Sequence, residues 1–274
     1  MTEAIKAFSV HRLSRGTLHA TSDLLAVEEP LEIRLNEQPL AVVMRTPGDD
    51  FNLACGFLLT EGLLTGADGR LVPLPGIDWA RDEFGLPIPN VVVCMLASLP
   101  AATVAAAQRR LYATSSCGIC GRASLERIFL QAPSLQRHFT LTAAALNQLP
   151  EKLAAAQSHF ARTGGLHAAA LFSDAGELVK VCEDIGRHNA VDKALGWALQ
   201  QGFYPLTDFG LLVSGRLSFE MAQKALLAGI SLVAAISAAS SLAVELAGAA
   251  GMALAGFVRG EQAVIYAGHE RIIR

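Results

Sequence analysis

Short apolar segments alternate with segments of helical spacing from about residue 139 onward, and this alternation constrains the fold more than any other feature. Residues 209–213, FGLLV, form an unbroken apolar run, which is typical of a strand buried on both faces. Because alternating strands and helices imply parallel crossovers, we expect an α/β fold in which helices cover both faces of one sheet. The expected strands are 168–172, 178–183, 209–213, 232–236, 253–258 and 263–266, and the expected helices are 142–158, 189–201, 218–228 and 240–249.

The first hundred or so residues follow a different pattern, which predicts a smaller α+β unit. Two apolar or alternating segments, 31–35 and 40–44, stand on either side of Asn36 and Glu37, as in a β-hairpin. The other elements expected here are a helix over 50–61, a Pro- and Gly-rich loop over 71–86, a strand over 90–96 and an alanine-rich helix over 101–111. We therefore divide the chain into an N-terminal α+β domain, 1–111, a loop segment, 112–138, and an α/β domain, 139–274.

Composition and charge exclude several classes of protein. Lysine and arginine number 22 and aspartate and glutamate 25, so the net charge is 22 − 25 = −3. We therefore expect neither a nucleic acid nor a membrane surface as the main partner. With 52% apolar and 17% charged residues, the chain has the composition of a folded protein. No charge stands between residues 225 and 244, but the Ala, Ser and Gly clusters there favour a helix end, a strand and a helix start over a membrane span.

The cysteines indicate the compartment. The first sixteen residues contain no apolar leader, and the five cysteines are an odd number, so we expect reduced thiols in a cytoplasmic protein. Cys55, Cys94 and Cys182 each stand in an apolar helix or strand, which predicts that they belong to the core.

Cys117 and Cys120 differ from these three, because they stand in a small, polar, glycine-containing segment, 112–122, YATSSCGICGR. A zinc site would need two further ligands, and the sequence has neither a second cysteine pair nor a spaced histidine pair. A thioredoxin-like motif would have an aromatic residue before it and proline within it, where this chain has Ser-Ser and Gly-Ile. A zinc deaminase would need a glutamate two residues after a histidine, and His167 is followed by two alanines.

A further interpretation of the cysteine pair is sulfur transfer through a persulfide. An ionised, accessible thiol takes the outer sulfur of a donor persulfide, and the resulting Cys–S–SH delivers it to an acceptor. Gly118 and Gly121 lower the cost of unusual backbone angles, and Arg122 favours the thiolate. The second cysteine can release the sulfur by forming a disulfide, or shield it. The alternative, two small buried hydrophobic side chains, fits a polar loop poorly.

Two turns that each follow an apolar strand and precede a helix contain a Gly-Arg pair. In the first turn, at 183–189, the backbone amides at the helix terminus would suit a phosphate or another anion, together with Arg187 and His188. The second is Ser214-Gly215-Arg216, and a further arginine, at position 259, ends a later strand. Because the carboxyl ends of parallel strands meet at the edge where ligands bind, these arginines could converge on one polyanionic ligand.

The first of these turns, EDIGRHN at 183–189, has simpler interpretations as well. Asn189 is a plausible N-cap, so a helix start with a surface ion pair is an alternative of about equal weight. Glu183 and Asp184 could accept hydrogen bonds from a purine edge, or pair with Arg187. Neither a GxGxxG motif nor a P-loop lysine motif is present, so an ordinary dinucleotide or ATP site is not expected.

These motifs together resemble the FdhD/NarQ family, the formate dehydrogenase accessory sulfurtransferases. The resemblance covers most of the chain and rests on the joint order of SSCGICG, EDIGRHNA and SGRLSFEM, each of which alone would be weak. It implies a C-terminal three-layer α/β domain similar to cytidine deaminase, without its zinc, next to a smaller α+β N-terminal domain. It also implies a homodimer.

The resemblance further implies a function. The chain would take sulfur from a cysteine desulfurase and pass it to the molybdenum (or tungsten) bis-molybdopterin guanine dinucleotide cofactor before that cofactor enters apo formate dehydrogenase. Cys117 would carry the persulfide and Cys120 would assist. The family's cofactor-contacting segment falls on Phe257, Val258, Arg259, Gly260, Glu261 and Gln262. With Arg187, His188, Ser214, Gly215 and Arg216, these are the expected contacts to the cofactor and its GDP-like moiety, and no metal ligand is expected.

Two alternatives stay open at the level of the sequence. A non-catalytic chaperone would bind the guanine dinucleotide cofactor and hand it over, which needs the arginines but not the thiols. A zinc protein would use Cys117 and Cys120 as two of its ligands.

Overall fold

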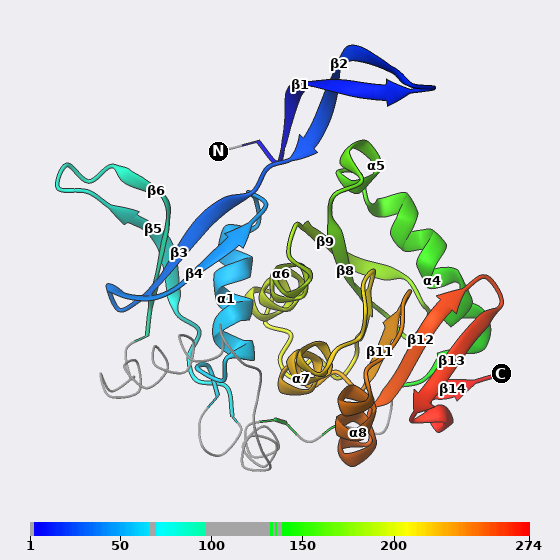
Figure 1. The fold of residues 1–274 in the computed structure, drawn as a ribbon. Helices are drawn as coiled ribbons and strands as arrows, with labels where there is room; N and C mark the ends of the chain where they lie inside the picture. The colour runs from blue at the N-terminus through cyan, green and yellow to red at the C-terminus, as the bar shows by residue number, and fades with distance from the viewer. Residues whose placement is uncertain (1–2, 66–69, 97–131, 134, 136–138) are drawn as a thin grey trace.

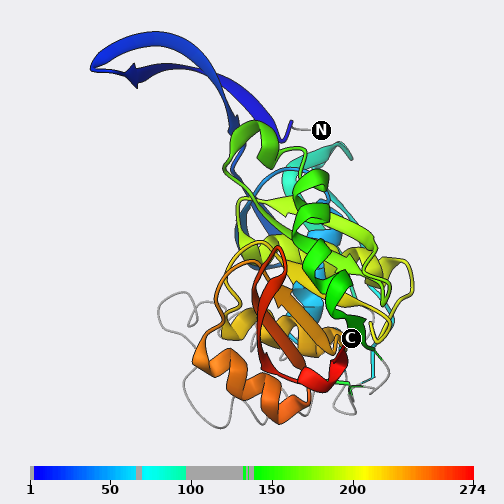
Figure 2. The same cartoon turned by 90° about the vertical axis from the view of Figure 1, so that its right-hand side faces the viewer.

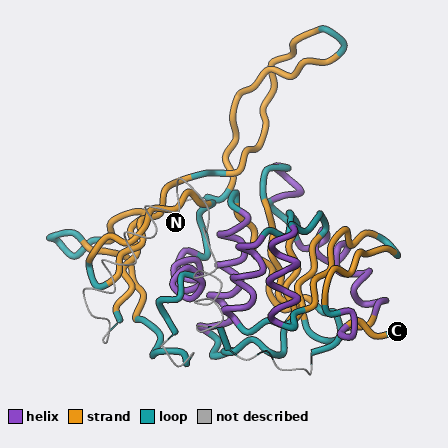
Figure 3. Tube along the Cα trace, turned by 60° about the horizontal axis from the view of Figure 1, so that its bottom comes forward, coloured by secondary structure: helices purple, strands orange, loops and turns teal. Residues whose placement is uncertain are grey.

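The computed structural model describes residues 3–65, 70–96, 132, 133, 135 and 139–274. Most of the described chain forms two sheets with helices between them, and a separate hairpin projects from this body, as Figure 1 and Figure 3 show. The predicted helix over 101–111 and the segment with Cys117 and Cys120 lie outside the described residues.

The larger sheet has six strands in the order β13-β12-β11-β10-β8-β9. The three central strands β10, β11 and β12 are parallel, because a helix crosses over between each of them and the next, whereas β8, β9 and β13 join antiparallel neighbours. All six strands expected from the sequence are therefore present. They are β8 (His167–Phe172), β9 (Leu178–Asp184), β10 (Gly210–Val213), β11 (Leu232–Ala235), β12 (Ala253–Arg259) and β13 (Gln262–Ala267).

Helices cover both faces of this sheet. Leu211 and Val213 pack into one apolar cluster with the helices α6, α7 and α8, whereas Leu212 packs into a second cluster with α4. This alternation explains why β10 is apolar at every position. The helices are α4 (Ala143–Ala156), the short α5 (Phe160–Thr163), α6 (Arg187–Gln200), α7 (Phe219–Ala228) and α8 (Ser241–Ala250). The predicted three-layer α/β fold is confirmed.

The N-terminal unit is a four-stranded sheet in the order β4-β3-β6-β5, with one helix, α1. The β3–β4 hairpin turns at Asn36 and Glu37, whose φ angles of 48° and 67° fit a type I′ turn. The predicted loop over 71–86 is wrong at 76–81, which form an edge strand flanked by proline and glycine. The elements are β3 (Glu29–Leu35), β4 (Gln38–Arg45), α1 (Asp50–Thr60), β5 (Gly76–Arg81) and β6 (Pro87–Met95).

The two units share one hydrophobic core, because α1 packs directly on α6. The helices touch at two glycines: a Cβ atom on Gly56 would overlap the carbonyl of Asp192, and one on Gly196 would overlap the carbonyl of Asn52. Only glycine allows the two backbones to approach this closely.

Several small elements were not predicted. They are the hairpin strands β1 (Ile5–Ser14) and β2 (Thr17–Ala26), the parallel pair β7 (Leu141–Thr142) and β14 (Ile272–Ile273), and the 3-10 turn η1 (His269–Arg271). The uncharged run 225–244 divides into the end of α7, β11 and the start of α8, as expected. Within the described residues, no helix is both long and apolar enough to cross a membrane.

Candidate anion-binding site

Three turns of the larger sheet meet at one edge. Because β9 and β10 run in the same direction on either side of the antiparallel β8, their carboxyl ends lie next to the amino end of β8. Arg187 and His188 open α6 after β9, Ser214 and Gly215 follow β10, and His167 begins β8. In open α/β sheets this edge is where ligands bind.

Arg187 is half-buried, and one nitrogen atom of its guanidinium has no hydrogen-bond acceptor among the described residues. Its Nε atom is buried and has no acceptor among the described residues. A Cβ atom on Gly215 would stand 3.9 Å from Arg187 Cδ and 3.5 Å from His167 Nδ1, so glycine leaves room beside both side chains. A buried donor without an acceptor is costly, and an anionic ligand would supply the missing acceptor.

The two histidines beside this arginine are held in the neutral form. Burial lowers the pKa of His188 to about 4, and the charges of Lys224 and Arg187 act in the same direction. Burial, followed by the charge of Arg187, also lowers the pKa of His167. At neutral pH these imidazoles therefore donate and accept hydrogen bonds without adding charge, and the cationic character of this turn comes from Arg187.

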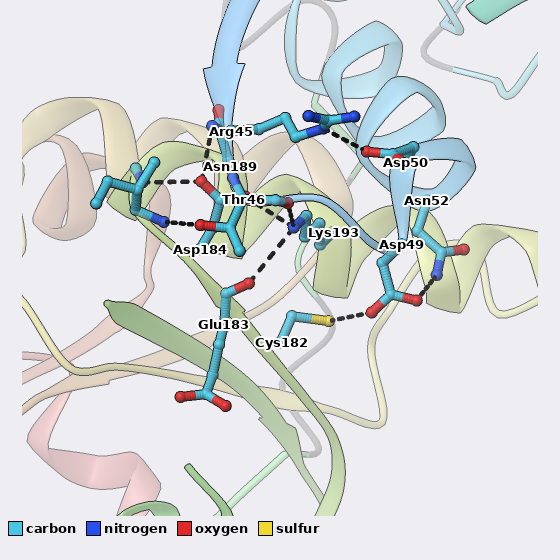
Figure 4. Close-up of polar contacts among 12 residues, drawn as sticks. Arg45, Thr46, Asp49, Asp50, Asn52, Cys182, Glu183, Asp184, Asn189 and Lys193 are labelled. Atoms are coloured by element: carbon cyan, nitrogen blue, oxygen red, sulfur yellow. Dashed lines mark hydrogen bonds and ion pairs between the residues drawn. The ribbon is translucent and has the colours of Figure 1, made fainter. Parts of the chain in front are cut away.

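The aspartate just before the turn is already engaged (Figure 4). Asp184 is fully buried, and its Oδ2 atom lies 2.7 Å from Lys193 Nζ and accepts the Thr46 amide at 3.1 Å. Its Oδ1 atom accepts the Gly186 amide at 2.8 Å and Asn189 Nδ2 at 2.9 Å. With four donors around it, this carboxylate holds the turn in place and is closed to a purine edge.

Glu183 is engaged elsewhere too. Its carboxylate accepts the backbone amides of His159 at 3.0 Å and Phe160 at 2.7 Å, at the start of α5. Neither acidic residue pairs with Arg187, so the pairing predicted from the sequence is wrong, and a contact between Glu183 and a purine edge remains a prediction.

The same network ties the N-terminal unit to α6. Lys193 Nζ donates to the Thr46 carbonyl at 2.8 Å, and Asn189 Nδ2 donates to the Met44 carbonyl at 2.7 Å. Asn189 is therefore not the predicted N-cap; Gly186 holds that position with extended backbone angles. Sequence reasoning missed Lys193 and Thr46, although a lysine within the apolar run of α6 is a signal of a buried ionic contact.

A second buried ion pair begins at Asp192, the residue just before Lys193 in α6. Lys224 Nζ lies 2.8 Å from both carboxylate oxygens of Asp192, and the Thr60 hydroxyl contacts both partners, at 2.9 Å from Asp192 Oδ1 and 2.8 Å from Lys224 Nζ. Burial raises the pKa of Asp192, and the Lys224 charge opposes this. This pair connects α1, α6 and α7 beneath the turn that carries His188.

The remaining predicted contacts are placed nearer the surface. Ser214 accepts the Ala168 amide through its hydroxyl at 2.9 Å, and Arg216 is exposed. Arg259 donates from Nε to the Ile236 carbonyl at 3.3 Å, and its guanidinium lies 5.9 Å from the centre of the Phe257 ring. At the end of β12 and the start of β13, Val258 is buried, whereas Phe257, Arg259, Gly260, Glu261 and Gln262 are exposed.

The three arginines lie along one edge, and their side chains lie closer together than the strands that carry them. Arg187 follows β9, but a Cβ atom on Gly215, after β10, would stand 3.9 Å from Arg187 Cδ, and Arg216 is the next residue. Arg259 ends β12 and donates to the Ile236 carbonyl just after β11. Their convergence on one ligand remains a prediction.

The described cysteines are unsuited to thiol chemistry. Cys55, Cys94 and Cys182 are buried, and burial raises the pKa of each thiol to about 12. The expectation that they belong to the core is confirmed. Cys117 and Cys120 lie outside the described residues. Within the described part of the chain, no three His, Cys, Asp or Glu side chains are grouped so that they could hold a metal ion.

Fold and site together define a class: an α/β protein whose three-layer domain presents arginine-bearing turns at the carboxyl edge of its sheet. The family follows from comparison with known proteins. The chain matches the FdhD/NarQ family over residues 26–273, and it belongs to that family.

Individual relatives agree. The chain is 50% identical to the sulfur carrier protein FdhD of Streptomyces avermitilis, over 96% of this chain and 94% of the relative, and 47% identical to that of Mycobacterium tuberculosis, over 96% of both. Among solved structures, it is similar to a candidate formate dehydrogenase accessory protein from Desulfotalea psychrophila, with a TM-score of 0.76 and 22% identity. That match covers 99% of this chain and 100% of the other. At this identity, the structural match shows the fold alone.

Proposed function

We propose that this protein is a sulfur carrier that serves a formate dehydrogenase, with Cys117 as the carrier. Membership of the FdhD/NarQ family and the shared name of the relatives support sulfur carriage. Elimination supports the choice of residue. The three described thiols, those of Cys55, Cys94 and Cys182, are buried, and their pKa of about 12 leaves almost no thiolate at neutral pH. The carrier must then be one of the two cysteines of the SSCGICG motif.

The proposed transfer needs no external electrons. The Cys117 thiolate attacks the outer sulfur of a persulfide on a cysteine desulfurase, the donor's sulfur–sulfur bond breaks, and the donor thiolate leaves. A new sulfur–sulfur bond forms on Cys117, so the donor persulfide becomes a thiolate, the Cys117 thiolate becomes a persulfide, and the transfer is redox-neutral overall. Cys120 stands two residues away from the carrier and is proposed to assist its release.

The acceptor we propose is the molybdenum bis-molybdopterin guanine dinucleotide cofactor, bound as a substrate before it enters apo formate dehydrogenase. The observation that carries this step is the buried, unbonded Nε of Arg187 at the ligand-binding edge. A dinucleotide cofactor offers several phosphates, which suits arginines that follow three strands of that edge. We place this chemistry in the cytoplasm.

Activation of apo formate dehydrogenase tests the proposal. In a mixture of cofactor, cysteine desulfurase and cysteine, the wild type is expected to activate the enzyme, and Cys117→Ala to lose activation almost completely. Cys182→Ala is the matched control, because this buried thiol has no proposed role and should retain activation.

A chaperone that only binds and delivers the cofactor is the second candidate, since the arginine edge needs no thiol. It predicts that the double variant Cys117→Ala/Cys120→Ala still activates the dehydrogenase, while Arg216→Ala does not. That pattern would overturn sulfur transfer and leave cofactor binding in place.

A further inference from the structure

A cleft lies between the β5–β6 hairpin, the end of β4, the start of α1 and the end of α6. Its volume is about 740 Å³, which is within the range of ligand-binding pockets. None of the residues placed at the arginine edge lines it. In Figure 2, where α4 and β13 face the viewer, the β5–β6 hairpin lies behind the larger domain. The cleft is therefore a separate feature of the molecule.

The walls of this cleft are aromatic and rich in proline. The Phe51 and Trp79 rings pack against each other with their centres 5.3 Å apart, and both side chains are half-buried. Opposite them β6 bulges, because its residues 88–91 stand against the single residue 80 of β5. Pro87, at the start of β6, and Pro89, in the bulge, occupy positions where a strand tolerates proline, and both are exposed. The walls therefore present an apolar surface that stays open to solvent.

A buried arginine forms the floor of the cleft. Arg45 is 1% exposed, and its Nε atom donates to Asp50 Oδ1 at 2.7 Å (Figure 4). Its other nitrogens reach Asn90 Oδ1 at 2.6 Å and Glu29 Oε2 at 3.4 Å. Asn90 holds this contact with a φ angle of 61°, a left-handed conformation that is uncommon within a strand. Because two carboxylates neutralise the guanidinium, the floor does not attract an anion.

The cleft as a whole favours a cation. One basic and two acidic side chains line it, 1 − 2 = −1. Glu29 and Lys180, which pair with lining residues, add one charge of each sign. Asp50, in the first turn of α1, offsets the positive end of that helix. The last turn of α6 contains no basic side chain, so the partial negative charge of its carbonyl end adds to the acidic character.

Asp49 is the carboxylate in this cleft that a ligand can reach. Its side chain is 40% exposed, Oδ1 accepts Asn52 Nδ2 at 3.0 Å, and Oδ2 lies 3.4 Å from Lys180 Nζ. An ion pair this exposed is weak, so an incoming cation can displace Lys180. A planar guanidinium suits the site best, because it pairs with a carboxylate and stacks on an indole ring such as that of Trp79.

We propose that this cleft binds an extended segment of a partner protein, with an arginine side chain against Asp49 and Trp79 and apolar neighbours on the prolines. A pocket for a small ligand buries most of that ligand, whereas this cleft is open, which favours a longer chain lying along it. Aromatic-lined grooves bind extended, proline-rich segments in this way. The inference does not depend on the sulfur carrier function.

An array of pentapeptides tests the proposal with the full chain. Each peptide has a central arginine flanked by Pro, Leu, Val or Phe, and a second array has citrulline in its place, which keeps the shape without the charge. The wild type is expected to bind the strongest arginine peptides at least about 10-fold more tightly than their citrulline counterparts.

Two aspartate variants locate the charge that the arginine reads. Asp49→Asn should lose at least about 10-fold in affinity for these peptides, because asparagine keeps the left-handed backbone of φ 56° but not the charge. Asp174→Asn is the matched control, since it removes the same charge from the exposed turn between β8 and β9, and should bind as the wild type does. Circular dichroism checks that both variants are folded.

Tryptophan fluorescence reports whether the peptide occupies the cleft. In Trp197→Phe, Trp79 is the only tryptophan, so the strongest arginine peptide should change its emission. Acetylarginine amide should need at least about 10-fold higher concentration, because it lacks the apolar neighbours. Absence of arginine-dependent binding, full binding by Asp49→Asn, or unchanged Trp79 emission would overturn the site. Equal affinity for acetylarginine amide would overturn the extended partner in favour of a small cation.

Discussion

At the scale of single residues, Arg187 is the strongest candidate for ligand binding, because its buried Nε atom has no acceptor among the described residues. The two acidic side chains before it are already hydrogen-bonded to other groups. The sequence singled out this arginine because a Gly-Arg turn after an apolar strand is a local pattern, and its role in anion binding remains a prediction. It misassigned the neighbours Glu183, Asp184 and Asn189, because their partners lie far away in sequence. Met44, which accepts from Asn189, is 145 residues distant. Local propensity predicts a cap, and tertiary contacts decide otherwise.

The Arg187 side chain should contribute directly to anion binding. With GDP as a surrogate for the guanine dinucleotide, calorimetry should show that Arg187→Ala weakens affinity by about 10- to 100-fold, because a charge-assisted hydrogen bond contributes about 1.5–3 kcal/mol. Arg216→Ala and Arg259→Ala should each weaken binding as well. Arg81→Ala, on the distant β5 strand, removes the same charge and should change nothing. Unchanged affinity in all three edge variants would place the anion site elsewhere.

At the scale of elements, the packing of α1 on α6 joins the smaller unit to the larger domain. The sequence predicted both helices, since each has a strong apolar pattern. It did not predict their contact, because the need for glycine at Gly56 and Gly196 follows only from the close approach of the two backbones. The strands β1, β2 and β5 were missed for a related reason. They are edge or projecting strands with little burial, so no apolar period distinguishes them from loops.

The glycine at this helix crossing should be essential for stability. Gly56→Ala is expected to lower the free energy of unfolding by about 3 kcal/mol or more, because its Cβ would overlap the Asp192 carbonyl. Gly248→Ala, in α8, is the matched control: nothing lies within 4 Å of the added Cβ, so the variant should gain about 0.5–1 kcal/mol. Urea unfolding of both variants measures the difference. Equal stability of the two would contradict the close approach of α1 and α6.

At the scale of the whole molecule, the alternation of strands and helices predicted the three-layer domain, because each crossover is local in sequence. The antiparallel β8–β9 pair is a local hairpin with an Asp- and Gly-containing turn, and the sequence predicts it. The antiparallel pairing of β8 with β10 and the two buried ion pairs required the structure, since each depends on contacts between distant segments. The result is a sheet edge at which Arg187 Nε has no acceptor among the described residues, next to the buried ion pairs Asp184–Lys193 and Asp192–Lys224. The proposed boundaries at 111 and 139 remain predictions.

The central claim is that Cys117 carries sulfur, and intact-mass measurement tests it most directly. After incubation with a cysteine desulfurase and cysteine, the wild type should gain one sulfur, about 32 Da, per chain, and a reducing agent should remove it. Cys117→Ala should gain nothing, while the control Cys182→Ala should gain as much as the wild type. A sulfur gain that persists in Cys117→Ala, or no gain in any form, would contradict the assignment of the carrier.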